Sequence, residues 1–304
     1  MHLTLQQLRL FEAVSRNNSF TRAAEELHLT QPAVSIQIKR LESHVGLPLF
    51  EKVGKKLYPT PAGQAVYQTS REILRSIAAL EQSLHDLKGS VRGALRLSVV
   101  TTAKYFLPHL IGQFLRLYPE VDPSLKFTNR ARIMDRLLNN EDDFVIMGQI
   151  PPGKGLVAHP FLENVIVPVA APDHPLAAKK RLPLEELVSA RVLAREEGSG
   201  TRIAFEKLLE AKNLTVEPYM ELGSAEAIKQ GVMAGLGVAI ISLHALQLEI
   251  STQKLVILDV EGFPIKRRWY AVHHQDKTLS ITARTFLDFI LETGRQPSDS
   301  RQSG

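Results

Sequence analysis

The spacing of hydrophobic residues changes twice along the chain. Over residues 1–60, apolar residues recur every three or four positions, which predicts short helices joined by tight turns. Residues 61–88 keep this spacing without a break and therefore predict one long amphipathic helix. From residue 94 onward, short apolar runs alternate with helical patterns, and this alternation predicts an α/β fold.

Three helices are predicted in residues 1–60. The second should span residues 20–27 with Ser19 as its N-cap, because a serine oxygen there accepts a bond from an otherwise unpaired helix N–H. Thr30 should cap the third helix, and Pro32 lies in its first turn, where the missing N–H costs nothing. The apolar residues that mark the first and third helices are Leu5, Leu8 and Phe11, and then Val34, Ile38, Leu41 and Val45.

The long helix carries an apolar seam and ends at the stretch KGSVRG. The seam residues step alternately by four and three positions, as in a coiled coil: Ile73, Ile77, Leu80, Leu84 and Leu87. One interpretation is a helix packed on its own domain. The other is a linker helix that pairs with a second copy of the chain, and we favour it because no apolar element lies near the seam in sequence.

The remaining residues read as strands and helices in alternation. The predicted strands are ALRLSVV, SLKFT, DFVIMG, VIVPVAAP, RVLA, PYMELGS, GVAIISL and RRWYAVH, and the helices are KYFLPHLIGQFLRLYP, ARIMDRLLNN, AEAIKQGVMAGL and SITARTFLDFILETG. Such alternation predicts a mostly parallel sheet covered by helices on both faces, and about 200 residues allow two sub-domains. The polar tail RQPSDSRQSG is predicted to be disordered.

The composition is that of an ordinary globular protein. The 304 residues are 44% hydrophobic and 23% charged, and the formal net charge of +5 permits an anionic partner without requiring one. The absence of cysteine excludes disulfides and thiolate metal sites. The N-terminus does not read as a secretory signal, and no apolar run is long enough to span a membrane, so we expect a cytoplasmic protein without a membrane partner.

Residues 20–45 have the layout of a helix-turn-helix. Two short helices meet at a tight turn, where His28 replaces the usual glycine and tolerates a positive φ. In such motifs the second helix enters the major groove with its first residues on base edges. Here that helix is rich in hydrogen-bonding side chains and has no acidic residue from 30 to 41. We therefore favour DNA binding over an ordinary three-helix bundle with a polar face.

A lysine-rich turn follows the third helix. Lys52, Lys55 and Lys56 surround Gly54 between two short β-like pieces, LFEK and KLYPT. Taken alone, such a turn is ordinary solvated surface. Beside a helix-turn-helix it predicts a hairpin wing whose lysines contact DNA phosphates, and such contacts give salt dependence rather than sequence preference.

The N-terminal region closely resembles that of LysR-type transcriptional regulators, through LRLFEAVSRNNSFTRAAEELHLTQPAVSIQIKRLESHVGLPLFEK and the following LYPTPAG. The resemblance covers essentially the whole chain. It implies an α/β protein with an N-terminal winged helix-turn-helix, a dimerising linker helix and a two-lobed effector domain shaped like a periplasmic binding protein. The implied bounds are 1–60 for the winged helix-turn-helix, 61–90 for the linker helix and 91–304 for the effector domain, with lobe I at about 91–163 and 268–295 and lobe II at about 164–267.

The resemblance also implies partners and DNA-contacting residues. The partners are double-stranded promoter DNA, a small effector and other copies of the chain, as a homodimer through the linker helix and as a homotetramer; RNA polymerase is a further candidate. Gln31, Ser35 and Gln37 are predicted to meet base edges, because glutamine can pair bidentately with adenine and serine is adaptable. Arg40 is predicted to contact phosphate. The full predicted DNA-binding set is Thr30, Gln31, Pro32, Ala33, Ser35, Gln37, Lys39, Arg40, Lys52, Lys55 and Lys56.

Polar side chains gather where predicted strands give way to helices. In a two-lobed α/β receptor the ligand lies between the lobes at these carboxyl ends of strands, where helix N–H groups favour anions. The residues predicted to bind the effector are Thr101, Thr102, Lys104, Asn129, Arg130, Gly148, Gln149, Ser199, Gly200, Thr201, Arg202, Glu226 and Lys229.

Each of these groups has a plainer alternative. Thr101, Ser199 and Ser224 could serve only as N-caps, and Arg130 and Arg202 could form surface ion pairs. Five separate strand ends carry such donors, however, and arginine recurs among them, so we predict a small anionic effector. Loss of Arg202 or Thr102 is then expected to abolish the ligand response without affecting DNA binding.

A narrower resemblance links the chain to the LysR-type regulators of Calvin-cycle (RuBisCO) operons. It rests mainly on EAIKQGVMAG and RRWYAVHHQDKTLS. It implies control of carbon-fixation genes and an effector that is a phosphorylated metabolite or a reduced nicotinamide nucleotide, with no cofactor. A LysR-type regulator of another metabolic operon, with a carboxylate effector, is the alternative.

An enzyme and a solute-binding protein are more distant alternatives. The phosphate-loop, dinucleotide-binding, nucleophile-elbow and zinc-protease signatures are all missing from the sequence. His273 and His274 are adjacent, so on a strand they point to opposite faces and cannot chelate a metal together. The helix-turn-helix argues against solute capture. We therefore expect neither catalysis nor a metal site.

Overall fold

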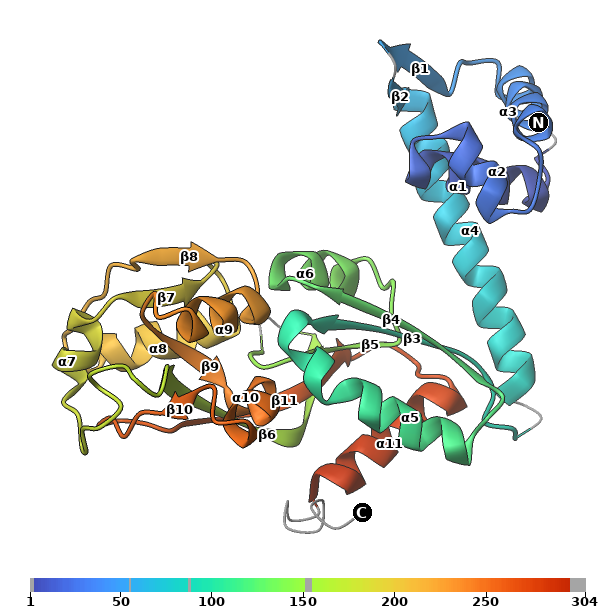
Figure 1. The fold of residues 1–304 in the computed structure, drawn as a ribbon. Helices are drawn as coiled ribbons and strands as arrows, with labels where there is room; N and C mark the ends of the chain where they lie inside the picture. Colours follow the sequence, from blue (N-terminus) through green and yellow to red (C-terminus); the bar gives the residue numbers. More distant parts are fainter. Residues whose placement is uncertain (1–2, 55, 87–88, 151–154, 296–304) are drawn as a thin grey trace. The chain divides into compact units, whose positions relative to one another are not determined.

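The computed structural model describes residues 3–54, 56–86, 89–150 and 155–295. The chain forms two compact units, Met1–Lys88 and Gly89–Gly304, which we call the N-terminal unit and the C-terminal unit (Figure 1). None of the helices in the described ranges has the length and hydropathy that a membrane span requires.

The N-terminal unit consists of helices and one antiparallel hairpin. Its elements are α1 (Leu5–Asn17), α2 (Phe20–Glu26), α3 (Gln31–Val45), β1 (Phe50–Val53), β2 (Lys56–Pro59) and α4 (Pro61–Asp86). The predicted helix starts are confirmed: Ser19 accepts a hydrogen bond from the backbone N–H of Arg22, and Thr30 accepts one from that of Ala33. His28 has a φ of 54°, so the turn between α2 and α3 has the left-handed backbone that its composition predicted.

The first turns of α4 pack on their own unit. Val66 and Tyr67 lie against the buried core formed by α1, α3 and the hairpin. Gly63 allows this close approach, because a Cβ at that position would lie 2.0 Å from the carbonyl oxygen of Leu49. Farther along α4, Leu80 and Leu84 are exposed in the single chain, while Leu87 lies outside the described residues. The helix therefore packs on its own unit at its start and leaves part of its seam uncovered.

The strands of the C-terminal unit form one sheet in the order β4-β3-β5-β11-β6-β9-β7-β8, with β10 beside β6. The strand bounds are β3 (Gly93–Val100), β4 (Val121–Thr128), β5 (Phe144–Met147), β6 (Leu156–Ala170), β7 (Val192–Arg195), β8 (Met220–Leu222), β9 (Val238–Ser242), β10 (Val256–Ile257) and β11 (Ile265–His274). The α-helices are α5 (Leu107–Leu117), α6 (Arg130–Leu138), α7 (Leu184–Ser189), α8 (Gly200–Glu210), α9 (Ala225–Met233), α10 (Gln247–Ser251) and α11 (Ile281–Arg295), and the 3₁₀ helices are η1 (Thr101–Tyr105) and η2 (Leu243–Ala245).

The sheet is mixed, so the prediction of a mostly parallel sheet is wrong for its centre. Neighbouring strands are parallel at each end, within β4-β3-β5 and within β9-β7-β8. In the centre, β11 pairs antiparallel with β5 and β6, and β6 pairs antiparallel with β9. The reason is that β6 and β11 are long strands that run in opposite directions between the two ends of the sheet. We call the β4-β3-β5 end lobe I and the β9-β7-β8 end lobe II (Figure 1).

Helices cover both faces of each lobe, as the alternation predicted. In lobe I, α5 and α11 bury Phe286 on one face, and α6 buries Ile133 on the other. In lobe II, α8 buries Phe205 on one face and α9 buries Ile228 on the other. The carboxyl ends of the parallel strands are thus left as the edges where loops can form a site.

The strand β6 begins nearer the N-terminus than the apolar run VIVPVAAP predicted. Pro160 interrupts the alternation in this part of the chain and has no N–H to donate to a sheet. The pairing of β6 with β11 accommodates the proline through an irregularity, because the register shifts between Trp269 and Tyr270, and Tyr270 faces Pro160.

Candidate functional site

A pocket lies between the two lobes of the C-terminal unit. Lobe I, lobe II and the crossing strands β6 and β11 all contribute to it. Its lining residues are Val100, Thr101, Thr102, Thr128, Asn129, Arg130, Met147, Gly148, Gln149, Asn164, Arg195, Glu196, Ser199, Gly200, Thr201, Arg267 and Trp269. The structure therefore brings together nine of the predicted effector residues, from four strand ends: Thr101, Thr102, Asn129, Arg130, Gly148, Gln149, Ser199, Gly200 and Thr201.

Lobe I supplies hydroxyls and one arginine. Thr101 begins η1 directly after β3, and its hydroxyl accepts a hydrogen bond from Arg195 Nη2 at 3.3 Å instead of capping a helix. Asn129 caps α6, and its side chain accepts from the backbone N–H of Arg132. Arg130 follows it and donates to Gln149 Oε1 at 2.7 Å, so the end of β5 holds the guanidinium at the pocket.

Lobe II supplies an uncapped helix N-terminus and a buried ion pair. Ser199 stands at the N-cap position of α8, but its hydroxyl makes no capping bond. The first N–H groups of α8 are thus available to an anion beside the Ser199 and Thr201 hydroxyls. Arg195 is buried and forms a bidentate pair with Glu196, with both N···O distances at 2.7 Å.

The pocket has an excess of positive charge. Among its lining residues Glu196 is the single carboxylate, and it is already paired with Arg195. Within the described ranges, no carboxylate forms an ion pair with Arg130 or Arg267. Burial and, second, the charge of Arg267 lower the pKa of Arg130, although a guanidinium stays protonated. Two guanidiniums that line the pocket and form no ion pair with a carboxylate in the described ranges make it suited to an anion.

Four of the predicted effector residues lie outside the pocket. Lys104 is exposed and lies over the Tyr105 ring. Arg202 points away and pairs with Glu206 and Glu221, which is the surface ion pairing weighed as its alternative. Glu226 and Lys229 interact with each other and with their own neighbours instead. Ser224 is an N-cap that accepts from Ala227 N–H, as its plainer interpretation predicted.

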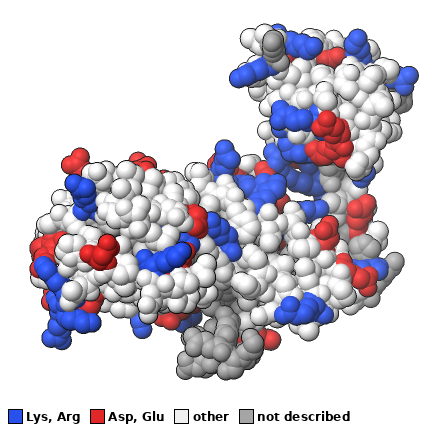
Figure 2. Space-filling model, in the orientation of Figure 1, with Lys and Arg blue, Asp and Glu red and all other residues white. Residues whose placement is uncertain are grey.

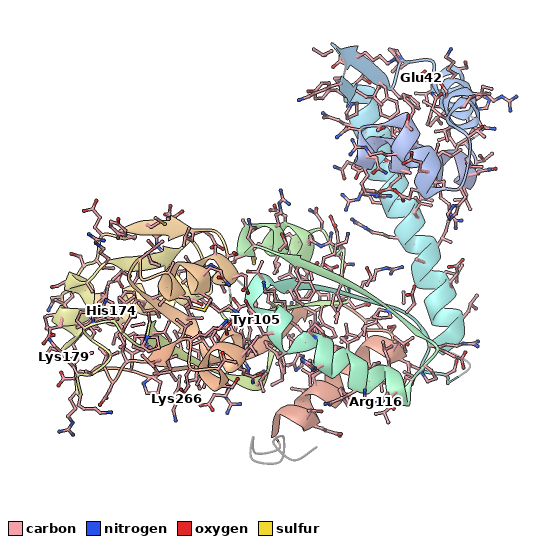
Figure 3. All side chains as sticks on the ribbon, in the orientation of Figure 1. Glu42, Tyr105, Arg116, His174, Lys179 and Lys266 are labelled. Carbon is pink, nitrogen blue, oxygen red and sulfur yellow. The ribbon has the colours of Figure 1, made fainter. Side chains whose placement is uncertain are left out.

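Glu226 and Lys229 belong to a polar cluster that joins the lobes, with Tyr105 and Glu249. The Nζ of Lys229 lies 2.7 Å from Glu249 Oε1 and 3.1 Å from Glu226 Oε2. It also lies 4.9 Å from the centre of the Tyr105 ring, and the Tyr105 hydroxyl donates to Glu226 at 3.1 Å. Figure 3 labels Tyr105 at the junction of the two lobes. Since Tyr105 ends the same 3₁₀ helix that begins with Thr101, this Tyr105–Lys229 cluster connects the pocket wall of lobe I to α9.

Sequence reasoning missed several polar residues that line the pocket. Thr128 and Arg195 are the last residues of strands β4 and β7. The expectation that the ligand lies at the carboxyl ends of strands could therefore have identified both. Asn164 and Arg267 face each other across β6 and β11, within long strands and away from their carboxyl ends. No strand-end signal marks such positions, because the crossing of these strands between lobes is a tertiary feature.

The predicted DNA-binding residues lie on α3 and the hairpin of the N-terminal unit. Exposed side chains include Thr30, Gln31, Pro32, Lys39, Arg40, Lys52 and Lys56, while Ala33, Ser35 and Gln37 are half-buried. Lys55 lies outside the described residues. Lys and Arg side chains are spread over the visible surface of this unit (Figure 2).

The side chain of Glu42 connects α3 to the hairpin. Its Oε1 accepts hydrogen bonds from the backbone N–H groups of Leu49 and Phe50, where the first strand begins. Figure 3 labels this residue on α3. The carboxylate of Glu42 is thus turned toward the hairpin of its own unit.

A histidine pair bridges β6 and β11 in lobe I. No group of three or more potential metal ligands occurs within the described ranges, but His273 lies against His159, with their Nε2 atoms 3.1 Å apart. The Nδ1 of His273 donates to the carbonyl oxygen of His274 at 2.7 Å. The Nε2 of neutral His273 is therefore an acceptor, and His159 donates to it.

Lowering the pH from about 7.5 to about 5.5 should destabilise the C-terminal unit through His159. Burial and, second, the charge of His273 lower the pKa of His159 below 6.5. The unfolded chain therefore takes up its proton first, and the free energy of unfolding falls as the pH drops through this range. Denaturant unfolding followed by the fluorescence of Trp269, the single tryptophan, measures this change.

The variant His159→Gln should show a shallower fall in stability over the same pH range. His109→Gln, on the exposed surface of α5, is the matched control and should keep the full pH dependence. Equal slopes for the wild type and His159→Gln would show that His159 does not cause the pH dependence.

Comparisons with known proteins bear on both units. A profile of the bacterial regulatory helix-turn-helix protein, lysR family, matches residues 5–64, and one of the LysR substrate binding domain matches residues 88–295. The HTH-type transcriptional activator CmpR of Synechocystis sp. is 46% identical over 287 residues, which are 94% of either chain. The RuBisCO operon transcriptional regulator of Allochromatium vinosum is 45% identical over 291 residues, 96% of either chain.

A solved structure resembles the C-terminal unit. It is that of the Synechocystis PCC6803 CcmR regulatory domain in complex with 2-PG. That domain is 44% identical to this chain, with a TM-score of 0.64, and the alignment covers 67% of this chain and 99% of the other.

Proposed function

Because this chain belongs to the LysR family of bacterial transcriptional regulators, we propose that it controls carbon-fixation genes in response to a small phosphorylated acid. The α2–α3 helix-turn-helix binds promoter DNA, with Gln31, Ser35 and Gln37 toward base edges and with Lys39, Arg40, Lys52 and Lys56 toward phosphates. The pocket between the lobes holds the effector. Support for the target genes comes from the relatives, among them a RuBisCO operon regulator at 45% identity.

The observation that carries the effector proposal is the uncompensated positive charge of the pocket. Arg130 and Arg267 face the cavity without a carboxylate partner in the described ranges, and α8 presents an uncapped N-terminus on the other side. The two features suit a ligand with two anionic groups, because each can take one of them. The similar CcmR domain binds 2-PG, 2-phosphoglycolate, which carries a phosphate and a carboxylate.

A ligand titration of the purified full-length protein tests this proposal. Trp269 lines the pocket and is the single tryptophan, so a change of its fluorescence on addition of ligand to the folded protein reports on this site. At about 100 times its Kd, 2-phosphoglycolate should stabilise the protein by about 2.7 kcal/mol in a thermal melt. Glycolate, which lacks the phosphate, is the matched control and should have little effect.

Each other outcome of the titration has a defined meaning. A response to NADPH and none to 2-phosphoglycolate would favour a reduced nicotinamide nucleotide as the effector. An equal response to glycolate would favour a plain carboxylate and a different operon. No response to any anion would refute the assignment of the pocket.

The remaining parts of the proposal concern assembly and class. We propose a homodimer through α4, since Leu80 and Leu84 are exposed on its seam, and a homotetramer through further contacts. A cytoplasmic location and the absence of catalysis are also proposed, in keeping with relatives that are named as regulators. Effector binding would stabilise one arrangement of lobes and subunits and so change how the DNA-binding units engage their half-sites.

A further inference from the structure

One of the exposed side chains of α3 is hydrophobic. Ile36 on α3 is 52% exposed, although the helix buries Val34 and Ile38 completely or nearly so on its inner face. Two residues beyond Val34, Ile36 lies roughly 200° around the helix axis and therefore on the opposite side. Gln37 lies on the flank and is half-buried. Ile36 thus projects farther from the unit than the glutamine predicted to read a base.

The surroundings of Ile36 suit a polyanion rather than a protein partner. Lys39 and Arg40 follow it on the same side of α3, and both are exposed. Neither forms an ion pair within the described ranges, so both remain available to phosphates. The nearest carboxylate along the helix, Glu42, is occupied by the backbone N–H groups of the hairpin. An apolar side chain is thus framed by unpaired positive charge.

We propose that Ile36 reads a thymine methyl group in the major groove of the operator. In a helix-turn-helix the second helix lies in the major groove with its first turns on base edges. The C5-methyl of thymine is the apolar group that the bases present there, and contact with an aliphatic side chain distinguishes thymine from cytosine. This inference rests on the proposed DNA-binding role of α3 and adds the identity of one base that it selects.

Substitution of uracil for thymine tests the proposal, because it removes the methyl group and keeps every hydrogen bond of the base pair. The probe is a duplex that the full-length protein selects from a random library, resynthesised with deoxyuridine at one thymine at a time. At fixed salt, the wild-type Kd should rise about fourfold at one thymine per half-site, the value of one buried methyl-sized group. Ile36→Ala should bind the thymine duplex correspondingly less tightly and should respond less than about 1.5-fold to uracil at that position.

Leu5→Ala is the matched control, since Leu5 is an exposed leucine on α1, outside the helix-turn-helix. It should keep the full response to uracil. Two results would overturn the inference: a wild-type Kd that no uracil substitution changes, or an Ile36→Ala variant as sensitive to uracil as the wild type. If no sequence-specific duplex can be selected at all, the proposed function itself fails, so the two failures are distinguishable.

Discussion

Replacing Arg267 by glutamine should remove most of the ligand response and leave DNA binding without ligand unchanged. Arg267 faces the pocket from β11 and has no carboxylate partner within the described ranges, so its charge is uncommitted until an anion arrives. A hydrogen bond to a charged group contributes about 1.5–3 kcal/mol. The Kd for 2-phosphoglycolate should therefore rise about 10- to 100-fold in a titration of Trp269 fluorescence.

The stability of the ligand-free variant separates a binding role from a structural one. Removing Arg267 also removes its repulsion of Arg130, whose pKa is lowered by burial and by that charge. The melting temperature without ligand should therefore stay the same or rise, which is common when a strained binding residue is replaced. A lower melting temperature together with unchanged affinity would contradict the assignment.

Two other basic residues serve as controls for Arg267→Gln. Lys266 precedes it on β11 and is exposed, and Figure 3 labels it on the C-terminal unit. Arg202 follows the pocket residue Thr201 along the chain, but its side chain pairs with Glu206 and Glu221. Lys266→Gln and Arg202→Gln should each leave the Kd within about twofold, because Lys266 is exposed and the Arg202 guanidinium pairs with acids outside the pocket. For Arg202 this expected outcome is the opposite of the prediction from sequence, in which loss of Arg202 abolishes the ligand response.

Replacing Lys229 by methionine should destabilise the C-terminal unit by about 3–5 kcal/mol. Lys229 is 4% exposed and forms an ion pair with Glu249, which is itself 7% exposed. Without the ammonium group, a buried carboxylate remains uncompensated, and its Oε2 already has no hydrogen-bond partner. For a unit of this size the melting temperature should fall on the order of 10 °C, as followed by Trp269 fluorescence.

Two further variants isolate the ion pair as the cause. The double variant Lys229→Met with Glu249→Gln should recover most of the lost stability, since no buried charge is then left unpaired. Lys179→Met breaks an exposed pair with Glu186 and should cost less than about 1 kcal/mol. If the double variant is no more stable than Lys229→Met, the loss comes from side-chain packing and not from the buried charge.

Local chemistry explains why the DNA-binding region could be predicted so fully from sequence. The side chains of Ser19 and Thr30 cap their helices by accepting hydrogen bonds from N–H groups three residues ahead. His28 adopts its left-handed backbone within one turn. Interactions of this range depend on neighbours along the chain and need no other part of the fold. The exposure of Ile36 could not be predicted in the same way, because the apolar pattern does not say which hydrophobic residue the core leaves out.

The pocket was predicted in part, for a reason that lies in the topology. Thr101, Arg130 and Ser199 lie in the segments that follow β3, β4 and β7, and the carboxyl ends of parallel strands converge on one edge. Arg202 and Lys229 also follow strands but turn to acidic partners that lie nearer in space. A position after a strand therefore predicts that a residue lies near the pocket. Whether its side chain points into the pocket depends on the opposite charges around it.

By itself the sequence determined the class of the protein, the helix-turn-helix with its caps, and the alternation that produces two lobes. These follow from hydrophobic periodicity, helix capping and sequence motifs, all of which can be read from neighbouring residues along the chain. The tertiary structure alone decided that β6 and β11 cross antiparallel between the lobes and carry Asn164 and Arg267 into the pocket. It also decided that Lys229 pairs with Glu249 and lies over the Tyr105 ring, outside the pocket. The physical reason is that pairing between distant charges depends on distance in space, which local patterns do not encode.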